Sequence, residues 1–128
     1  MTLRIVRLGT PRAAGEGLRV GTVRRPPHGV PATRFASEDW YDVWYPNLAP
    51  SVETMKLGKG AQTERDRATF KKRFRAEMSE PLPSRTLDLL AALSQTADLS
   101  VGCYCEDEAR CHRSVLRELL AERGAKIG

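Results

Sequence analysis

The chain has 128 residues, of which 41% are hydrophobic and 29% charged, and its formal net charge is +5. Such a length supports one hydrophobic core, and the composition is that of a globular domain rather than of a disordered chain. No apolar run approaches the roughly 20 residues that a membrane span needs, and the N-terminus alternates apolar and basic residues, unlike a signal peptide. We therefore expect one cytoplasmic domain over residues 1–128, with no membrane partner.

Two strand patterns open the chain. Thr2–Leu8 is mostly apolar, and Leu18–Val23 alternates between two side-chain faces, so both segments predict strands. Gly9–Gly17 between them is rich in glycine and predicts a loop. Arg24–Pro31 holds three prolines, which exclude a helix or a central strand and place this basic segment on the surface.

The middle of the chain begins with an aromatic segment, Ser37–Pro50, whose closely spaced rings cannot all be buried. Some of these rings are expected to cap the sheet or to line a cleft. Ser51 is a suitable N-cap for a short helix. Lys56–Gly60, with the sequence Lys-Leu-Gly-Lys-Gly, predicts a flexible basic loop.

The second half of the chain has helical patterns around one apolar run. Thr63–Ser79 places Phe70, Phe74 and Met78 on one helical stripe, and Pro81 and Pro83 are expected to end this segment. A second helix is predicted from Ser84 to about Thr96, with Leu87, Leu90, Ala91 and Ser94 facing inward and Leu89 and Leu93 widening the apolar stripe. A buried strand over Leu99–Cys105 follows. The last predicted helix covers Cys111–Arg123 and buries Val115, Leu116, Leu119 and Leu120.

This order of elements predicts an α/β domain with a mainly parallel sheet flanked by helices. In open α/β sheets, ligands bind at the carboxyl edge of the strands. The last strand ends at that edge, so the segment between it and the last helix is where we look for function.

This junction, Cys103–Arg113, concentrates cysteine, histidine and charged side chains. A helix N-terminus offers free N–H groups and a favourable dipole to an anion, and Arg110, His112 and Arg113 add donors. A thiol at Cys111 would be a candidate nucleophile there, with His112 as the acid/base candidate. This interpretation predicts a site for a phosphate or a carboxylate.

Two other interpretations of the junction remain open. Cys103, Cys105, Cys111 and His112 are four potential zinc ligands, although Cys-x-Cys is tighter than the usual spacing and neighbouring helical residues point in different directions. The cysteines are also of a type that is often simply buried. We therefore expect no metal and no cofactor, and keep a zinc-stabilised domain as an alternative.

The same residues carry a family resemblance. Cys105-Glu106 followed by Cys111-His112-Arg113, between an apolar strand and a leucine-rich helix, resembles the domain of unknown function family 488 (DUF 488). Further matching pieces, in the manner of its YeaO-like branch, are Gly17-Leu18-Arg19-Val20, Arg24 with Pro27-His28-Gly29, Trp44 with Leu48-Ala49-Pro50-Ser51, and Phe70–Glu77. The resemblance spans residues 3–123 and implies a compact α/β fold. It departs at Val23 and His28, where that branch usually has aspartate and arginine.

Together these observations predict one polar cleft at the carboxyl edge of the sheet. The residues predicted to bind the ligand are Arg24, His28, Trp44, Glu106 and Arg113, with Cys111 and His112 as catalytic candidates. The expected partner is a small anionic ligand or a nucleotide. The alternative is a non-enzymatic nucleic-acid-binding module that uses Arg65, Lys71, Lys72, Arg73 and Arg75.

Overall fold

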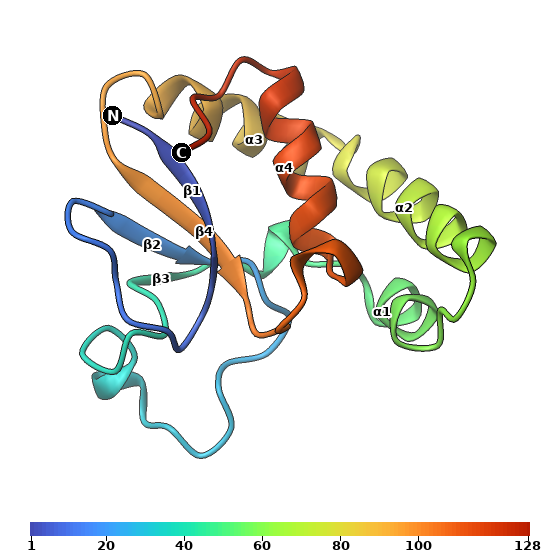
Figure 1. Ribbon diagram of the computed structural model, residues 1–128, viewed down its shortest axis with the longest axis horizontal. Coiled ribbons are helices and arrows are strands. Elements are labelled where there is room, and N and C mark those ends of the chain that lie inside the picture. The colour runs from blue at the N-terminus through green and yellow to red at the C-terminus, as the bar shows by residue number, and fades with distance from the viewer.

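Four parallel strands form the sheet at the centre of the computed structural model, which describes residues 1–128 (Figure 1). The strands are β1 (Leu3–Arg7), β2 (Leu18–Gly21), β3 (Val43–Trp44) and β4 (Leu99–Cys103), in the order β1-β4-β2-β3. All three strand pairs are parallel. The predicted α/β fold class is therefore confirmed. The two central strands, β4 and β2, end at the edge where the predicted site lies.

One face of the sheet packs against the helices. Leu3 pairs with Leu99, and Val20 pairs with Val101, so these four side chains point to the same side. They form a core with α2 (Glu64–Met78), α3 (Pro81–Leu93) and α4 (His112–Glu122). Of the stripe predicted on the first long helix, Phe74 and Met78 are buried there, and Phe70 is partly buried.

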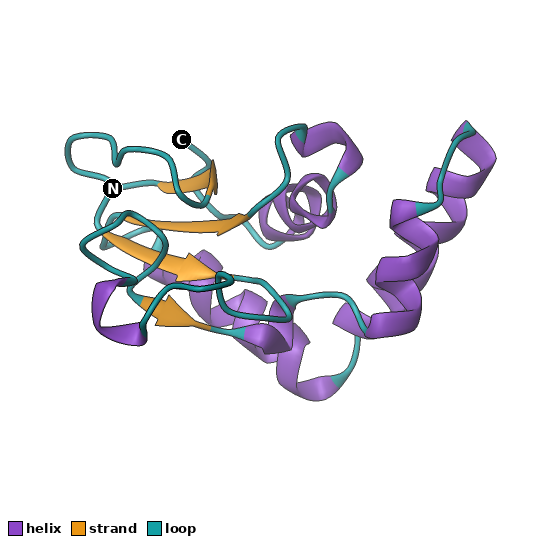
Figure 2. Ribbon diagram, turned by 90° about the horizontal axis from the view of Figure 1, so that it is seen from below, coloured by secondary structure: helices purple, strands orange, loops and turns teal.

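The opposite face is covered by loops. Arg19 and Ser100 point to this side, where the loop between β1 and β2 brings Glu16 against both. The segment that follows β2, with a 3-10 helix at Ala32–Arg34, lies beside that loop below the strands in Figure 1. Figure 2, seen from below, shows these loops in front of the strands, with helices behind the strands and to their right. Tyr41 from the aromatic segment is buried here, with Phe35 packed edge-on against it.

Helix α1 (Val52–Lys59) extends further than the sequence predicts. Ser51 caps it as expected, since its side chain accepts a hydrogen bond from the Thr54 N–H. The expected flexible loop at Lys56–Gly60 is wrong, because this segment forms the last turn of the helix. Gly58 is needed there for packing: a Cβ atom at this position would lie 2.9 Å from the Phe70 ring of α2.

Helix α3 also begins earlier than predicted. Pro81 and Pro83 were expected to precede a helix starting at Ser84, but Pro81 is its first residue. The first turn of a helix tolerates proline because its N–H groups have no partner within the helix. Leu87 is buried as predicted, whereas Leu89 and Leu93 are exposed and do not widen the apolar stripe.

The last strand and the last helix follow the prediction closely. Strand β4 is buried along its whole length and ends at Cys103, two residues short of the predicted end. Helix α4 buries Val115, Leu116, Leu119 and Leu120 as expected. A 3-10 turn, Glu108–Arg110, lies between the two elements. None of the helices combines the length and the apolar character that crossing a membrane requires.

Candidate functional site

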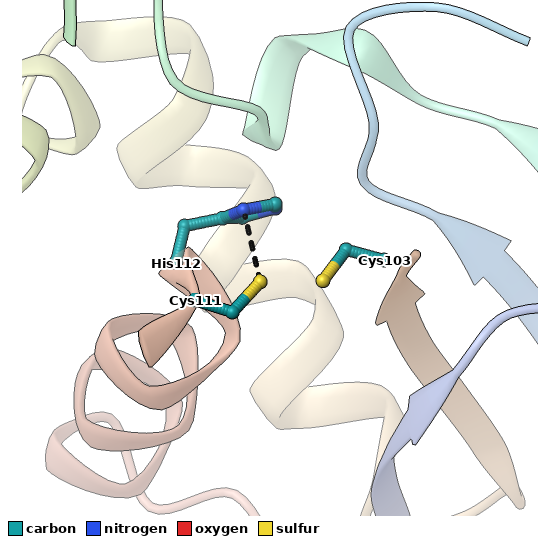
Figure 3. A group of neighbouring side chains, drawn as sticks. All are labelled: Cys103, Cys111 and His112. Atoms are coloured by element: carbon teal, nitrogen blue, oxygen red, sulfur yellow. Dashed lines mark hydrogen bonds between the residues drawn. The ribbon is translucent and has the colours of Figure 1, made fainter. Parts of the chain in front are cut away.

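The junction between β4 and α4 brings two cysteines and a histidine together. Cys103 is the last residue of β4, Cys111 is the N-cap of α4, and His112 is the first residue of that helix. Their ligand atoms all lie within 4.8 Å of one another. Figure 3 shows the Cys103 thiol pointing towards the Cys111 thiol and the His112 ring. Residues eight positions apart in the chain therefore converge on one small volume.

The conformation of Cys111 makes this arrangement possible. Its backbone is extended, with φ −122° and ψ 158°, so Cys111 precedes the helix and is not part of it. The angular separation of neighbouring helical residues, which the sequence suggested for Cys111 and His112, therefore does not apply. Both side chains point to the same place.

The hydrogen bonds of His112 define its tautomer. Its Nε2 atom lies 2.7 Å from the backbone carbonyl oxygen of Thr22, which can only accept, so Nε2 carries the proton. The Nδ1 atom is then the unprotonated nitrogen, and it lies 3.6 Å from the Cys111 sulfur. The imidazole is thus held between the end of β2 and Cys111, with a free lone pair directed at the thiol.

The electrostatics keep this histidine neutral. Burial lowers the pKa of His112 to about 4, although the Thr22 carbonyl works in the opposite direction. The Cys103 thiol lowers the pKa of Cys111, but Cys105 and burial outweigh it and raise that pKa overall. At neutral pH the two groups are therefore an uncharged thiol and an uncharged imidazole.

Cys105 and Arg113 complete the junction. Hydrogen bonds from Cys103 and Cys111, together with the charge of Arg113, lower the pKa of the exposed Cys105 thiol. Arg113 is buried, and its Nη2 atom donates to the Cys105 carbonyl at 2.6 Å. Its Nε–H has no partner. Arg113 is therefore a buried guanidinium whose only hydrogen-bond partner is a backbone carbonyl.

A cleft of about 550 Å³ opens beside this junction. It lies between the α1–α2 pair and the start of α4, and we call it the basic cleft. Its charged lining side chains are Lys59, Glu64, Arg67, Lys71 and Arg110. Cys111 and Ser114, at the start of α4, also line the cleft. Lys71 pairs with Glu118 at 2.8 Å, whereas Lys59, Arg67 and Arg110 form no salt bridge. The volume is in the range of small-molecule sites.

Arg24 and Trp44 lie apart from the basic cleft. The Arg24 guanidinium donates to the carbonyls of Ala49 and Pro50 at 3.0–3.1 Å, and Arg24 lines a second hollow of about 390 Å³ that also contains Glu77. Trp44 is partly exposed on β3, and its Nε1 atom donates to the Val23 carbonyl at 2.8 Å. Neither residue lines the basic cleft, although Val23, whose carbonyl binds Trp44, packs with Cys103 and Cys111.

The other two predicted ligand-binding residues are on the surface. His28 is exposed in the proline-rich loop. The Glu106 side chain is 85% exposed and lies 3.7 Å from Arg7. Of the residues predicted to bind the ligand, Glu106 and Arg113 belong to the junction, and Arg113 is the one that is buried there beside the catalytic candidates Cys111 and His112.

The sequence interpretation left one part of this site open and missed another. Cys103 was weighed both as a zinc ligand and as a buried packing residue, and the structure places its thiol close to Cys111 and His112. Lys59 and Arg67 were missed because no local pattern shows that the α1–α2 pair approaches α4. That approach depends on tertiary packing, including the close contact of Gly58 with Phe70.

Comparisons with known proteins identify the family. A family described as DUF488-N3a, the active DUF488-N3 subclade, matches residues 3–124. The chain therefore belongs to the DUF488 family, and within it to the DUF488-N3a subclade, as the residues around Cys111-His112-Arg113 indicated for the family. No curated protein and no solved structure matches the chain.

Proposed function

We propose that this protein is an enzyme that acts on a small phosphate-bearing substrate, such as a nucleotide, in the basic cleft. The observation that carries the proposal is the charge of the cleft: three cationic side chains without a salt bridge, Lys59, Arg67 and Arg110, line it together with a single carboxylate, that of Glu64. Arginine guanidinium groups suit phosphate oxygens because they donate two parallel hydrogen bonds. Arg67 and Arg110, which have no acidic partner, are the binding groups that we assign.

The reaction takes place where the cleft meets the junction. Cys111 lines the cleft, and His112 adjoins it with an unprotonated nitrogen. The start of α4 adds the positive end of the helix dipole, which favours an anion at this place. The description of the family's subclade as active supports an enzymatic role.

Two finer assignments accompany this proposal. We keep the YeaO-like branch as the predicted relationship within the wider family, on the strength of the Arg24 and Leu48-Ala49-Pro50-Ser51 segments. We also place the activity in the cytoplasm, where three unpaired cysteines would stay reduced.

Calorimetric titration with pyrophosphate tests the binding step. The double variant Arg67→Gln/Arg110→Gln should bind pyrophosphate at least about 10-fold more weakly than the wild type, because each charge-assisted hydrogen bond contributes about 1.5 kcal/mol or more. Arg65→Gln is the matched control, since Arg65 lies on the same helix but does not line the cleft. Equal loss in the control, or no binding by the wild type, would contradict the proposal.

Activity assays test the catalytic step. The wild type is incubated with nucleoside mono-, di- and triphosphates and with sugar phosphates, and the products are separated by liquid chromatography. Cys111→Ser and His112→Gln should abolish any turnover that is found, while Arg65→Gln should retain it. Turnover that survives in both site variants would exclude Cys111 and His112 from the active site.

A further inference from the structure

We propose that Cys103, Cys111 and His112 bind a zinc ion through Cys103 Sγ, Cys111 Sγ and His112 Nδ1, and that the fourth position of the zinc is left for water or the substrate. This inference deepens the proposed function, because it names the group that contacts the substrate in the basic cleft. It rests on the proposed function only for the nature of that substrate.

The donor set fits zinc. Two thiolates and one neutral imidazole are ligands that zinc prefers, and catalytic zinc sites commonly have three protein ligands and one open position. Of these residues, Cys111 lines the basic cleft. A zinc ion bound to it is therefore close to the place where the substrate is proposed to bind.

The distances also fit. Zinc–sulfur bonds of about 2.3 Å and zinc–nitrogen bonds of about 2.1 Å at a tetrahedral angle separate a sulfur and a nitrogen ligand by about 3.6 Å. The Cys111 sulfur and His112 Nδ1 are 3.6 Å apart. Two sulfur ligands would be about 3.8 Å apart, and all three ligand atoms lie within 4.8 Å of one another. Only small side-chain movements would complete the site.

The environment of His112 matches that of a metal ligand. A ligating histidine usually donates its other N–H to a carbonyl or a carboxylate, which fixes the tautomer and the orientation of the ring. Here Nε2 donates to the Thr22 carbonyl at 2.7 Å, and Nδ1 faces the two sulfurs (Figure 3). The same hydrogen bond would orient a general base towards a metal-free Cys111 thiol, so zinc content distinguishes the two chemistries.

Arg113 provides the charge that such a site needs. Two thiolates neutralise the zinc ion, so an anionic substrate oxygen or hydroxide in the fourth position leaves one negative charge. Arg113 is buried next to His112 in the sequence, and it has no carboxylate partner and an unused Nε–H. This unpartnered buried donor is an independent indication that the junction holds negative charge.

Zinc content and cobalt spectroscopy test the inference. The untagged wild-type chain, purified without chelators, should contain one zinc per chain, as measured by inductively coupled plasma mass spectrometry. After removal of the zinc, added Co²⁺ should give the thiolate-to-metal charge-transfer absorption of a site with two sulfur ligands. Absence of zinc and of this absorption in the wild type would overturn the inference, and this measurement does not depend on whether any variant folds.

Variants test the ligand assignment. Cys103→Ser, Cys111→Ser and His112→Gln should each lower zinc affinity by more than about 100-fold, which exceeds the usual effect of losing a group that only orients a ligand. Cys105→Ser is the matched control and should keep one zinc per chain. If Cys105→Ser loses zinc as completely as Cys103→Ser, the three-ligand assignment is wrong.

The failure of this inference can be told apart from failure of the proposed function. Pyrophosphate binding that depends on Arg67 and Arg110 in a zinc-free wild-type chain would leave the proposed function in place and reject the zinc site. Zinc bound at the junction without any pyrophosphate binding would reject the phosphate-bearing substrate and retain the metal site.

Discussion

Two buried polar clusters lie at different places on the same sheet, one on its loop-covered face and one at the carboxyl edge of its strands, and only one of them is complete. On the loop-covered face, every nitrogen of the Arg19 guanidinium has a partner, including both carboxylate oxygens of Glu16 at 2.7 and 3.0 Å. At the carboxyl edge, Arg113 bonds only to the carbonyl of Cys105 and keeps an unused Nε–H.

The difference separates a structural role from a binding role. Buried charges normally have partners, because an unpaired buried charge is costly. The Glu16–Arg19 pair closes the loop between β1 and β2 against Ser100 and needs nothing from outside the chain. At the junction, by contrast, the buried Arg113 guanidinium keeps an unused Nε–H, which is why we propose that this place holds the negative charge of a ligand.

The largest effect is expected from breaking the complete cluster. Arg19→Met leaves Glu16 as an unpaired buried carboxylate, which should lower the free energy of unfolding by about 3–5 kcal/mol. Urea denaturation of the purified chain measures this. The double variant Glu16→Gln/Arg19→Met should recover part of the loss, because it removes the unpaired charge. A loss below about 1 kcal/mol in Arg19→Met would show that the pair is not a structural determinant.

The pH dependence of stability provides a second test of the Glu16–Arg19 cluster. Burial raises the pKa of Glu16, but hydrogen bonds from Arg19, Ser100 and the Ala13 N–H outweigh it and lower the pKa from 4.5 to about 2. A lowered pKa in the folded state stabilises the protein above pH 4.5, and this stabilisation is lost as the pH falls towards 2. The loss should amount to about 3 kcal/mol in the wild type. Glu16→Gln should lack this part of the acid dependence in denaturation curves recorded from pH 6 to pH 2, and identical slopes would contradict the assignment.

The incomplete cluster should respond differently to a similar change. Arg113→Met removes one hydrogen bond and no carboxylate partner, so the free energy of unfolding should fall by only about 1–2 kcal/mol. Pyrophosphate affinity should nevertheless fall by about 10-fold or more, because a buried cation at the junction is gone. Denaturation and titration of the same sample provide both values. A stability loss as large as that of Arg19→Met, with unchanged pyrophosphate affinity, would make Arg113 a structural residue.

The smallest effect is expected at the surface of α2. Arg75 pairs with Glu122 at 2.7 Å and with Glu118 at 3.5 Å, and these groups are partly exposed. Arg75→Gln should change the stability by less than about 1 kcal/mol.

The same variant tests the nucleic-acid alternative. Lys71 and Arg75 both pair with acidic residues of α4, which leaves less free positive charge on the face predicted to bind nucleic acid. Retention of single-stranded DNA should therefore be weak in the wild type and unchanged in Arg75→Gln. Strong, salt-dependent retention that Arg75→Gln abolishes would favour the binding module instead.

The sequence predicted the elements better than their ends. Apolar patterns located β1, β2, β4 and the long helices, because burial of one face determines their sequences, but they did not show the two-residue strand β3, both of whose side chains are exposed. They misplaced the start of α3, since Pro81 is as compatible with a first helical turn as with a loop. The sequence pattern also missed the last turn of α1. Gly58 locally suggests a loop, but here the glycine lies inside a helix because a side chain at this position would clash with the Phe70 ring.

The site was predicted in part. Strand–helix alternation pointed to the β4–α4 junction, and the residue types there indicated Cys111, His112 and Arg113. The position of Arg24 could not be predicted in the same way, because the carbonyls that bind it belong to Ala49 and Pro50, in a segment without a strong pattern. The cationic side of the cleft was missed for the same reason, since the packing of α1 and α2 against α4 is a long-range property.

A crystal structure of the wild-type chain grown with pyrophosphate tests the central claim most directly. We predict density for the anion in the basic cleft, within hydrogen-bonding distance of the Arg67 and Arg110 side chains and adjacent to Cys111. Pyrophosphate bound only elsewhere on the surface, with this cleft filled by water at saturating concentration, would contradict the claim that the junction of the last strand and the last helix is the substrate site.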